Sequence, residues 1–157
     1  MKFLLILGGG GHTTEMLSLS KSIEGSFEYV VGREDGLSYK KILKKGKVYK
    51  TINLRKMNAS GLNWGFNFFP AFFSSFVILL KTKSKVIITS GPAIAIPFIL
   101  LGKIFFFKKI IFIEDLARVY TKSTTGKIAY YLSDQFFVQW PELKKQYKRA
   151  IYAGRLM

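Results

Sequence analysis

Short apolar runs alternate with longer amphipathic segments along the whole chain. Residues 2–7 (KFLLIL) form an unbroken apolar run, which is typical of a strand buried on both faces. Residues 12–24 instead place their apolar side chains three or four positions apart, which indicates a helix with one buried face. The expected inner face of this helix comprises Met16, Leu17, Leu19 and Ile23.

The same two patterns recur to the end of the chain. The predicted strands are residues 2–7, 27–31, 47–54, 86–90, 109–114, 135–139 and 150–154. The predicted helices are residues 12–24, 36–45, 67–82, 93–106 and 123–132, then a short helix that opens at Trp140 and Pro141. Strands that alternate with helices form a parallel sheet covered on both faces. We therefore expect an α/β fold, a doubly wound Rossmann-like parallel sheet, in a single domain over residues 1–157.

Four glycines separate the first strand from the first helix, in the sequence LGGGGHTTEM. Ligands of doubly wound sheets bind beyond the carboxyl ends of the strands. Glycine lets the backbone approach a ligand closely, and the N-terminus of the next helix attracts an anion. The loop therefore predicts a cradle for phosphate or pyrophosphate, with a simple tight turn as the alternative. Its expected contact residues are Gly9, Gly10, Gly11, Thr13 and Thr14, of which either threonine could cap the helix, with Glu15 in the first turn.

His12, the only histidine of the chain, lies at the lip of this loop. An imidazole there can donate to an anion or accept a proton near neutral pH, so His12 is a candidate catalytic residue. Glu114 and Asp115 stand at the end of another buried strand. A carboxylate at that position could act as a general base, bind a sugar hydroxyl or orient His12, and Glu114 is the second catalytic candidate. Arg118 could bind phosphate. Alternatively, it could pair with Glu114 or Asp115 in a purely structural role.

A third turn, with Ser90 and Gly91, is expected at the same edge and should contribute to the same cleft. The glycine loop is not a Walker motif, because no Gly-Lys-Ser/Thr follows it. It is also a poor dinucleotide fingerprint, since threonine replaces the third glycine and Gly32 and Arg33 end the second strand. A dinucleotide-dependent oxidoreductase or epimerase is therefore the less favoured alternative.

Charge narrows the choice of partners. The chain has 25 Lys and Arg against 9 Asp and Glu, a formal charge of +16, which implies an anionic partner. It has no cysteine and a single histidine, which excludes disulfides and sites built from several histidines, and no carboxylate-rich metal motif is recognisable. We expect no metal and no cofactor. No nucleic-acid-binding motif is visible either, which leaves an anionic membrane or a phosphorylated substrate.

Two apolar runs raise the question of membrane contact. Residues 66–80 and 91–107 both fall short of the ~20 apolar residues that a spanning helix needs, and Lys103 interrupts the second. Either both are buried helices, or the first inserts into a membrane surface that the cations also attract. The candidate membrane-contact residues are Trp64, Phe66, Phe68, Phe69, Phe72 and Phe73. MKFLLIL does not resemble a signal peptide, because it ends in glycines.

Four segments together resemble one protein family. They are LGGGGHTTEML, TSGPAIAIP, IEDLARVYTKSTTGKIAYYLSDQFFVQWPELKK and YAGRL, and they span nearly the whole chain in the family's order. They are similar to the membrane-recruiting subunit of the two-part UDP-N-acetylglucosamine transferase of the dolichol pathway. Bacterial and archaeal members of this family serve in exopolysaccharide and capsule synthesis.

The resemblance implies the N-terminal-type half of a GT-B glycosyltransferase divided between two chains. This half would bind a polyprenyl- or dolichyl-pyrophosphate-linked acceptor, while a donor-binding partner chain would hold the UDP-sugar. The pyrophosphate would lie at the glycine loop, and His12 or Glu114 would take the proton of the attacking sugar hydroxyl. Many eukaryotic members carry an N-terminal membrane anchor, whereas this sequence starts in the first strand. We therefore expect peripheral attachment at the cytoplasmic face of a membrane. The alternative is a recruiter without a catalytic role.

Overall fold

The computed structural model describes residues 1–54 and 68–156 of the chain. Trp64, Phe66 and the predicted loop over residues 55–65 lie outside the described residues. The strands are β1 (Lys2–Ile6), β2 (Ser26–Gly32), β3 (Gly46–Thr51), β4 (Val86–Thr89), β5 (Lys109–Ile113), β6 (Gln135–Val138) and β7 (Ile151–Tyr152). The helices are α1 (Gly10–Ser22), α2 (Gly36–Lys41), α3 (Phe68–Lys81), α4 (Ala95–Ile104), α5 (Thr124–Leu132) and the short 3₁₀-helix η2 (Pro141–Lys145).

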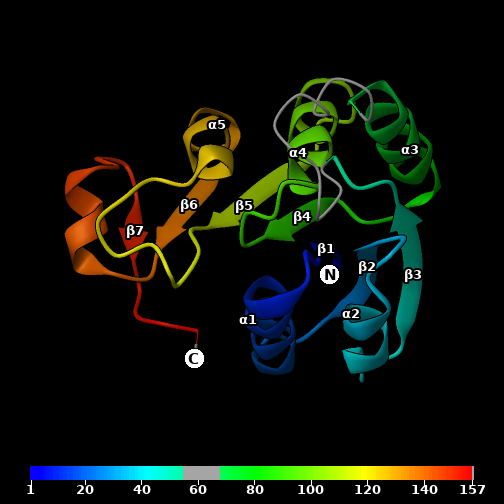
Figure 1. Cartoon of the computed structure of the whole chain (residues 1–157), viewed down its shortest axis with the longest axis horizontal. Coiled ribbons are helices and arrows are strands. Elements are labelled where there is room, and N and C mark those ends of the chain that lie inside the picture. Colours follow the sequence, from blue (N-terminus) through cyan, green and yellow to red (C-terminus); the bar gives the residue numbers. More distant parts are fainter. Residues whose placement is uncertain (55–67, 157) are drawn as a thin grey trace.

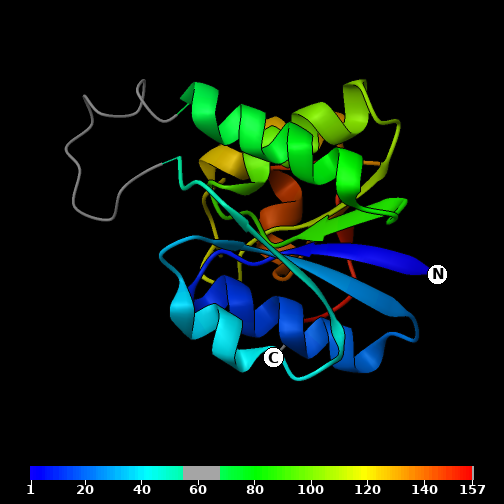
Figure 2. The ribbon, with the colours of Figure 1, turned by 90° about the vertical axis from the view of Figure 1, so that its right-hand side faces the viewer.

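The seven strands form one parallel sheet in the order β3-β2-β1-β4-β5-β6-β7 (Figure 1). Helices α1 and α2 lie on one face, and α3 and α4 lie on the other (Figure 2). The predicted fold class, a doubly wound Rossmann-like sheet, is confirmed. Strands β1 and β4 are almost entirely apolar because helices cover both of their faces, whereas β2 also contains the buried Glu28.

The order of the strands reverses between β1 and β4. The chain moves outward from β1 to β2 and β3, then returns to place β4 on the other side of β1. The turns after β1 and β4 consequently lead to helices on opposite faces of the sheet and leave a crevice between them. Any ligand site of this fold is expected at that crevice.

Several predicted boundaries are wrong. Helix α1 begins at Gly10 rather than residue 12, because Gly9, with φ 79°, takes the cap position without any side-chain cap. The proposed capping by Thr13 or Thr14 is therefore wrong, and Glu15 lies beyond the first turn. Helix α2 ends at Lys41, four residues before the predicted end, and the last strand shrinks to Ile151–Tyr152.

Gly8 brings the first turn against the β4–α4 turn. A Cβ at Gly8 would overlap the ring of Pro92, so this contact requires glycine. Gly11 differs, because a Cβ there would have no neighbouring atom within 4 Å. The two glycines therefore have separate physical roles within one short run.

We expect Gly8→Ala to lower the free energy of unfolding by about 1–3 kcal/mol, as overpacking of a rigid contact does. Gly11→Ala is the matched control and should raise it by about 0.5–1 kcal/mol, since alanine loses less entropy in a helix. Urea unfolding followed by circular dichroism measures both. Equal effects of the two substitutions would contradict the packing of Gly8 on Pro92.

Candidate functional site

The turns after three strands converge on His12. His12 Nδ1 lies 3.2 Å from Ser90 Oγ, which joins the glycine turn to the turn after β4. His12 Nε2 lies 3.6 Å from Asp115 Oδ2, which follows β5. The His12 and Asp115 side chains are 24% and 27% exposed, so both reach the solvent at the mouth of the crevice. The structure thus brings His12, Ser90 and Asp115 together, as expected for one sheet edge.

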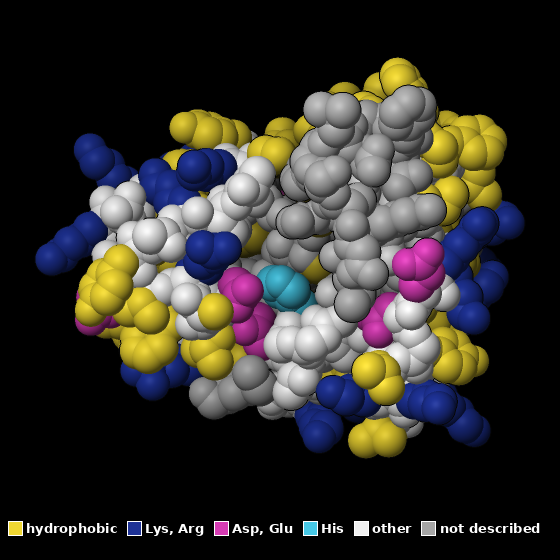
Figure 3. Space-filling view, viewed as in Figure 1, with side chains coloured by type: hydrophobic (Ala, Val, Ile, Leu, Met, Phe, Trp, Pro, Cys, Tyr) yellow, Lys and Arg dark blue, Asp and Glu magenta, His cyan; other side chains and the backbone are white. Residues whose placement is uncertain are grey.

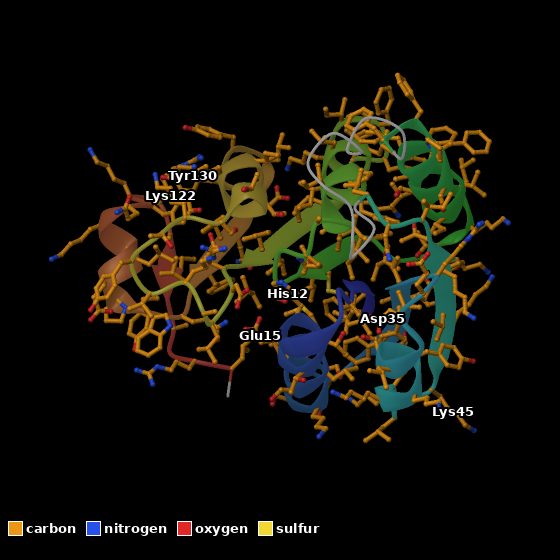
Figure 4. The ribbon with its side chains drawn as sticks, viewed as in Figure 1. His12, Glu15, Asp35, Lys45, Lys122 and Tyr130 are labelled. Atoms are coloured by element: carbon orange, nitrogen blue, oxygen red, sulfur yellow. The ribbon has the colours of Figure 1, made fainter. Side chains whose placement is uncertain are left out.

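Glu15 lies about one helical turn after His12 on the same face of α1 and completes this cluster (Figure 4). Its side chain is buried, and Oε1 accepts a hydrogen bond of 2.9 Å from the backbone N–H of Leu116. Burial raises the pKa of the Glu15 carboxyl above its ordinary value, against the lowering effect of the Leu116 hydrogen bond. We did not name Glu15 as a site residue from the sequence. Its spacing of three from His12 was the available signal.

Glu114 does not reach the His12 cluster. Its carboxylate is fully buried on the α5 side of the sheet, where Oε2 accepts a hydrogen bond of 2.8 Å from the Tyr147 hydroxyl. The backbone N–H of Ser123 also points to Oε2, at 3.4 Å. Gly126 leaves the space that this carboxylate needs, because a Cβ there would overlap it. Asp115, the next residue, occupies the position in the crevice that we expected for Glu114.

The environment of Tyr147 supports an internal role for Glu114. Burial, together with the adjacent Glu114 carboxylate, raises the pKa of the Tyr147 phenol well above its ordinary range. The phenol therefore stays a hydrogen-bond donor at all physiological pH values. The backbone carbonyl of Glu114 in turn accepts a hydrogen bond of 3.0 Å from Gln139 Nε2. These contacts hold the β5–α5 loop against η2 and β6.

The other predicted phosphate contacts divide into exposed and internal groups. Arg118 is exposed; its Nη1 donates to Thr121 Oγ1 at 3.4 Å, and it forms no ion pair within the part of the chain that the structure describes. Thr14 is exposed and donates to the Gly10 carbonyl oxygen. Thr13 is buried, and its hydroxyl accepts the Gly9 N–H at 3.1 Å. The Thr13 hydroxyl is thus used inside the fold.

A cavity of about 470 Å³ adjoins the glycine turn. Gly9 and Gly10 form one wall, and Asp35 at the start of α2 forms another. Asp35 caps α2 by accepting the Ser38 N–H at 2.9 Å.

Gly91, with φ 96°, lies in the β4–α4 turn, and a Cβ there would approach Phe112 Cζ to 2.9 Å. Glycine is therefore required at this turn as well.

Carboxylates, rather than cations, adjoin the histidine on this face. Figure 3 shows Asp and Glu side chains directly to the left of the histidine, with most Lys and Arg side chains toward the rim. The net charge of +16 is thus unevenly distributed. The centre of the crevice differs in sign from the periphery that would meet an anionic surface.

Comparison with known proteins identifies related chains. Residues 3–156 match the family described as "Oligosaccharide biosynthesis protein Alg14 like". The mouse UDP-N-acetylglucosamine transferase subunit ALG14 is 33% identical over 182 residues, covering 100% of this chain and 83% of the relative. The Schizosaccharomyces pombe subunit of the same name is 34% identical over 170 residues, covering 96% of this chain and 81% of the relative.

Solved structures share the fold at low sequence identity. MurG of Acinetobacter baumannii superposes with a TM-score of 0.71 at 14% identity, covering 90% of this chain and 42% of MurG. UDP-GlcNAc 2-epimerase of Neisseria meningitidis gives a TM-score of 0.67 at 16% identity, covering 99% of this chain and 47% of the epimerase. The chain therefore spans less than half the length of these two proteins, and the likeness concerns the fold alone.

Glu15 generates a prediction about pH. Because folding raises the pKa of Glu15 above its ordinary value, the folded state binds more protons than the unfolded state between the two pKa values. The contribution of Glu15 to stability therefore falls as the pH rises through this window. We expect Glu15→Gln to gain stability relative to the wild type as the pH is raised from 4 to 7.

Urea unfolding at several pH values measures this difference. Glu142→Gln is the matched control, since it removes the same charge from an exposed residue of η2 and should show no such trend. If the free energy of unfolding of the wild type instead rises relative to that of Glu15→Gln from pH 4 to 7, burial does not disfavour the charged form of Glu15.

Proposed function

Because this chain belongs to the Alg14-like family of oligosaccharide biosynthesis proteins, we propose that it is the acceptor-binding subunit of a two-chain UDP-sugar glycosyltransferase. Its relatives are named UDP-N-acetylglucosamine transferase subunits, and a subunit requires a partner chain. In this proposal the partner binds the UDP-sugar, and the present chain binds a sugar linked to a lipid pyrophosphate. Family membership also removes the basis for the oxidoreductase alternative.

The observation that carries the proposal is the position of His12. The imidazole stands where the turns after β1, β4 and β5 meet, and the glycines that precede it in the chain line a cavity of about 470 Å³. The glycine turn and the N-terminus of α1 offer backbone N–H groups to a pyrophosphate. Ser90 and Gly91 form the opposite side of the crevice, and the exposed Arg118 can reach a phosphate oxygen.

The hydrogen bonds of His12 support a role as general base. Ser90 Oγ donates its proton to the His12 carbonyl oxygen at 3.4 Å, so Ser90 Oγ itself accepts a hydrogen bond from His12 Nδ1 at 3.2 Å. In that tautomer Nε2 keeps its lone pair and faces the crevice. It takes the proton as the sugar oxygen attacks the anomeric carbon, and the bond from that carbon to UDP breaks. Asp115, 3.6 Å from Nε2, stabilises the resulting imidazolium.

The partner chain has a candidate docking surface on β5 and β6, on the face of the sheet that α1 also covers. Within the described residues no helix covers this part of the α1 face, and half-buried Ile111 and Phe137 line a cavity of about 300 Å³ there. Leu156 closes one side, held by hydrogen bonds to Ser18 and Gln139. An apolar element of the donor-binding chain can cover this surface and complete the cleft.

Helix α3 supports attachment to a membrane surface. Its inner face packs on the core, whereas its outer face exposes a series of apolar side chains. The exposed residues are Phe68, Phe69, Phe73, Phe76 and Leu80. Phe72, a predicted membrane contact, instead packs partly into the core. Among the described residues, none of the helices has the length and apolarity needed to cross a bilayer, so the proposal is attachment through α3.

The proposed function is tested by reconstitution. Co-expressed with a donor-binding chain, this chain should co-purify and transfer GlcNAc from UDP-GlcNAc to a polyprenyl-pyrophosphate-linked sugar. Alone, it should neither transfer sugar nor bind UDP. Transfer by the isolated chain would contradict the division of the enzyme between two chains.

Within the reconstituted pair, we expect His12→Ala to lower kcat by at least about tenfold, because general-base help contributes about 10²–10⁴-fold. Its melting temperature should stay near that of the wild type, since the side chain is partly exposed. Glu114→Gln should instead lower the melting temperature, because it perturbs the buried contact with Tyr147. Steady-state kinetics and thermal unfolding separate the two effects. A His12→Ala pair with wild-type kcat would favour the alternative, a recruiter without a catalytic group.

Membrane attachment gives a separate prediction. Phe69→Ser combined with Phe73→Ser should weaken binding to anionic vesicles at high salt, where screening removes most of the attraction of the cations. Both side chains are exposed, at 79% and 71%, so the variant should fold. Leu43→Ser, an exposed residue beside α2, is the control. Vesicle co-sedimentation measures the bound fraction, and unchanged binding by the double variant would exclude α3 as the contact.

A further inference from the structure

We propose that His12, Glu15 and Asp115 form a binding site for a divalent cation at the mouth of the crevice. One ligand atom from each residue lies within 4.8 Å of the others. Two ligands of the same ion can be at most twice the metal–ligand bond length apart, which is about 4 Å for Zn²⁺ and about 5 Å for Ca²⁺. Small side-chain rotations would therefore bring the three side chains onto one ion. This inference goes beyond the proposed function.

Hydrogen bonds from the protein fix two of the three ligands. His12 Nδ1 contacts Ser90 Oγ at 3.2 Å, which leaves Nε2 directed toward Asp115. Glu15 Oε1 accepts the Leu116 N–H at 2.9 Å, which leaves Oε2 for another partner. Metal-binding side chains are characteristically oriented in this way, through the polar atom that does not touch the ion.

Asp115 follows the same arrangement. Its Oδ1 accepts the N–H of Ala117 at 2.9 Å, and its Oδ2 faces His12. Each of the three residues thus uses one polar atom inside the protein, and one ligand atom of each lies within 4.8 Å of the others. Two separate chain segments, helix α1 and the loop after β5, contribute to this point, so proximity along the sequence alone does not account for it.

The second observation is the unpartnered oxygen of Glu15. Oε2 is buried and forms no hydrogen bond of good geometry within the described residues, although the Ser90 hydroxyl lies near enough to lower the pKa of the carboxyl; Glu15 as a whole is only 1% exposed. A buried polar atom without a partner is costly and calls for a ligand. Oε2 belongs to the carboxylate that faces His12 and Asp115, where a cation would supply the missing partner.

The charge balance favours a cation in the same place. The ion pairs of the described residues are Lys2–Glu28, His12–Asp115 and Lys103–Asp134. Neither carboxylate of the cluster therefore has a Lys or Arg partner there, although the chain has 25 such residues against 9 acidic ones. Two carboxylates beside one imidazole attract a cation from solution.

The ligand types indicate which cation. Imidazole with two carboxylates suits Zn²⁺ or Mn²⁺ better than Ca²⁺ or Mg²⁺, which prefer oxygen alone. His12 and Asp115 are partly exposed, so a further coordination position would open to the crevice. An ion on His12 Nε2 also occupies the lone pair that proton transfer requires. The cation-bound chain is accordingly a form in which His12 cannot act as a base.

Isothermal titration calorimetry of the full chain with ZnCl₂ and MnCl₂ tests the site. The protein should carry no histidine tag and should first be treated with a chelator. We expect one saturable site, with Glu15→Gln and Asp115→Asn each weakening binding of the tighter ion by at least tenfold. Asp35→Asn is the matched control, because it removes a nearby carboxylate charge, and it should bind like the wild type.

Absorption of bound Co²⁺ gives a second readout that does not depend on activity. The wild type should show the visible bands of a nitrogen- and oxygen-ligated ion, and His12→Ala should change them. If Glu15→Gln does not fold, the partly exposed Asp115 provides the test through Asp115→Asn. Absence of saturable binding, or equal affinity in the wild type, Glu15→Gln and Asp115→Asn, would overturn the proposal. It would leave the proposed transferase role untouched.

Discussion

The reversal of strand order between β1 and β4 is the constraint on which the site depends. Because β2 and β3 extend to one side of β1 and β4 lies on the other, the turns after β1 and β4 separate and create a crevice. The turns remain in contact at their base, where Gly8 packs on Pro92, and at their rim, where His12 meets Ser90. Without this topology, His12 and Asp115 would have no reason to be neighbours.

Much of the fold could be predicted from the sequence, because strands buried on both faces read as uninterrupted apolar runs. The sequence could predict that the site lies at the carboxyl edge of the sheet, but not which side chains face it. Successive residues of an extended chain point to opposite faces, so the choice between Glu114 and Asp115 depends on which face each one meets. That information comes from packing against α1 and α5. Glu15 could not be predicted as a buried site residue, because a carboxylate in an amphipathic helix is normally exposed.

The distribution of charge and apolar surface separates the three proposed tasks on one small domain. Cations lie toward the rim, where they can meet an anionic membrane, and the phenylalanines of α3 add an apolar contact. The crevice contains an imidazole and carboxylates, which suit proton transfer or a bound ion. The apolar surface of β5 and β6 on the α1 face of the sheet is suited to a partner chain. Each task uses a different edge or face of the sheet, so they need not compete for surface.

In the proposed enzyme this chain holds the acceptor while its partner holds the donor. Amide chemical shifts of the ¹⁵N-labelled chain, titrated with a short-chain polyprenyl-pyrophosphate-linked GlcNAc, test it most directly. We predict saturable shifts at Gly9, Gly10, His12 and Gly91 with the lipid-linked sugar, and none with UDP-GlcNAc. Shifts at these residues with UDP-GlcNAc, and none with the lipid-linked sugar, would contradict it.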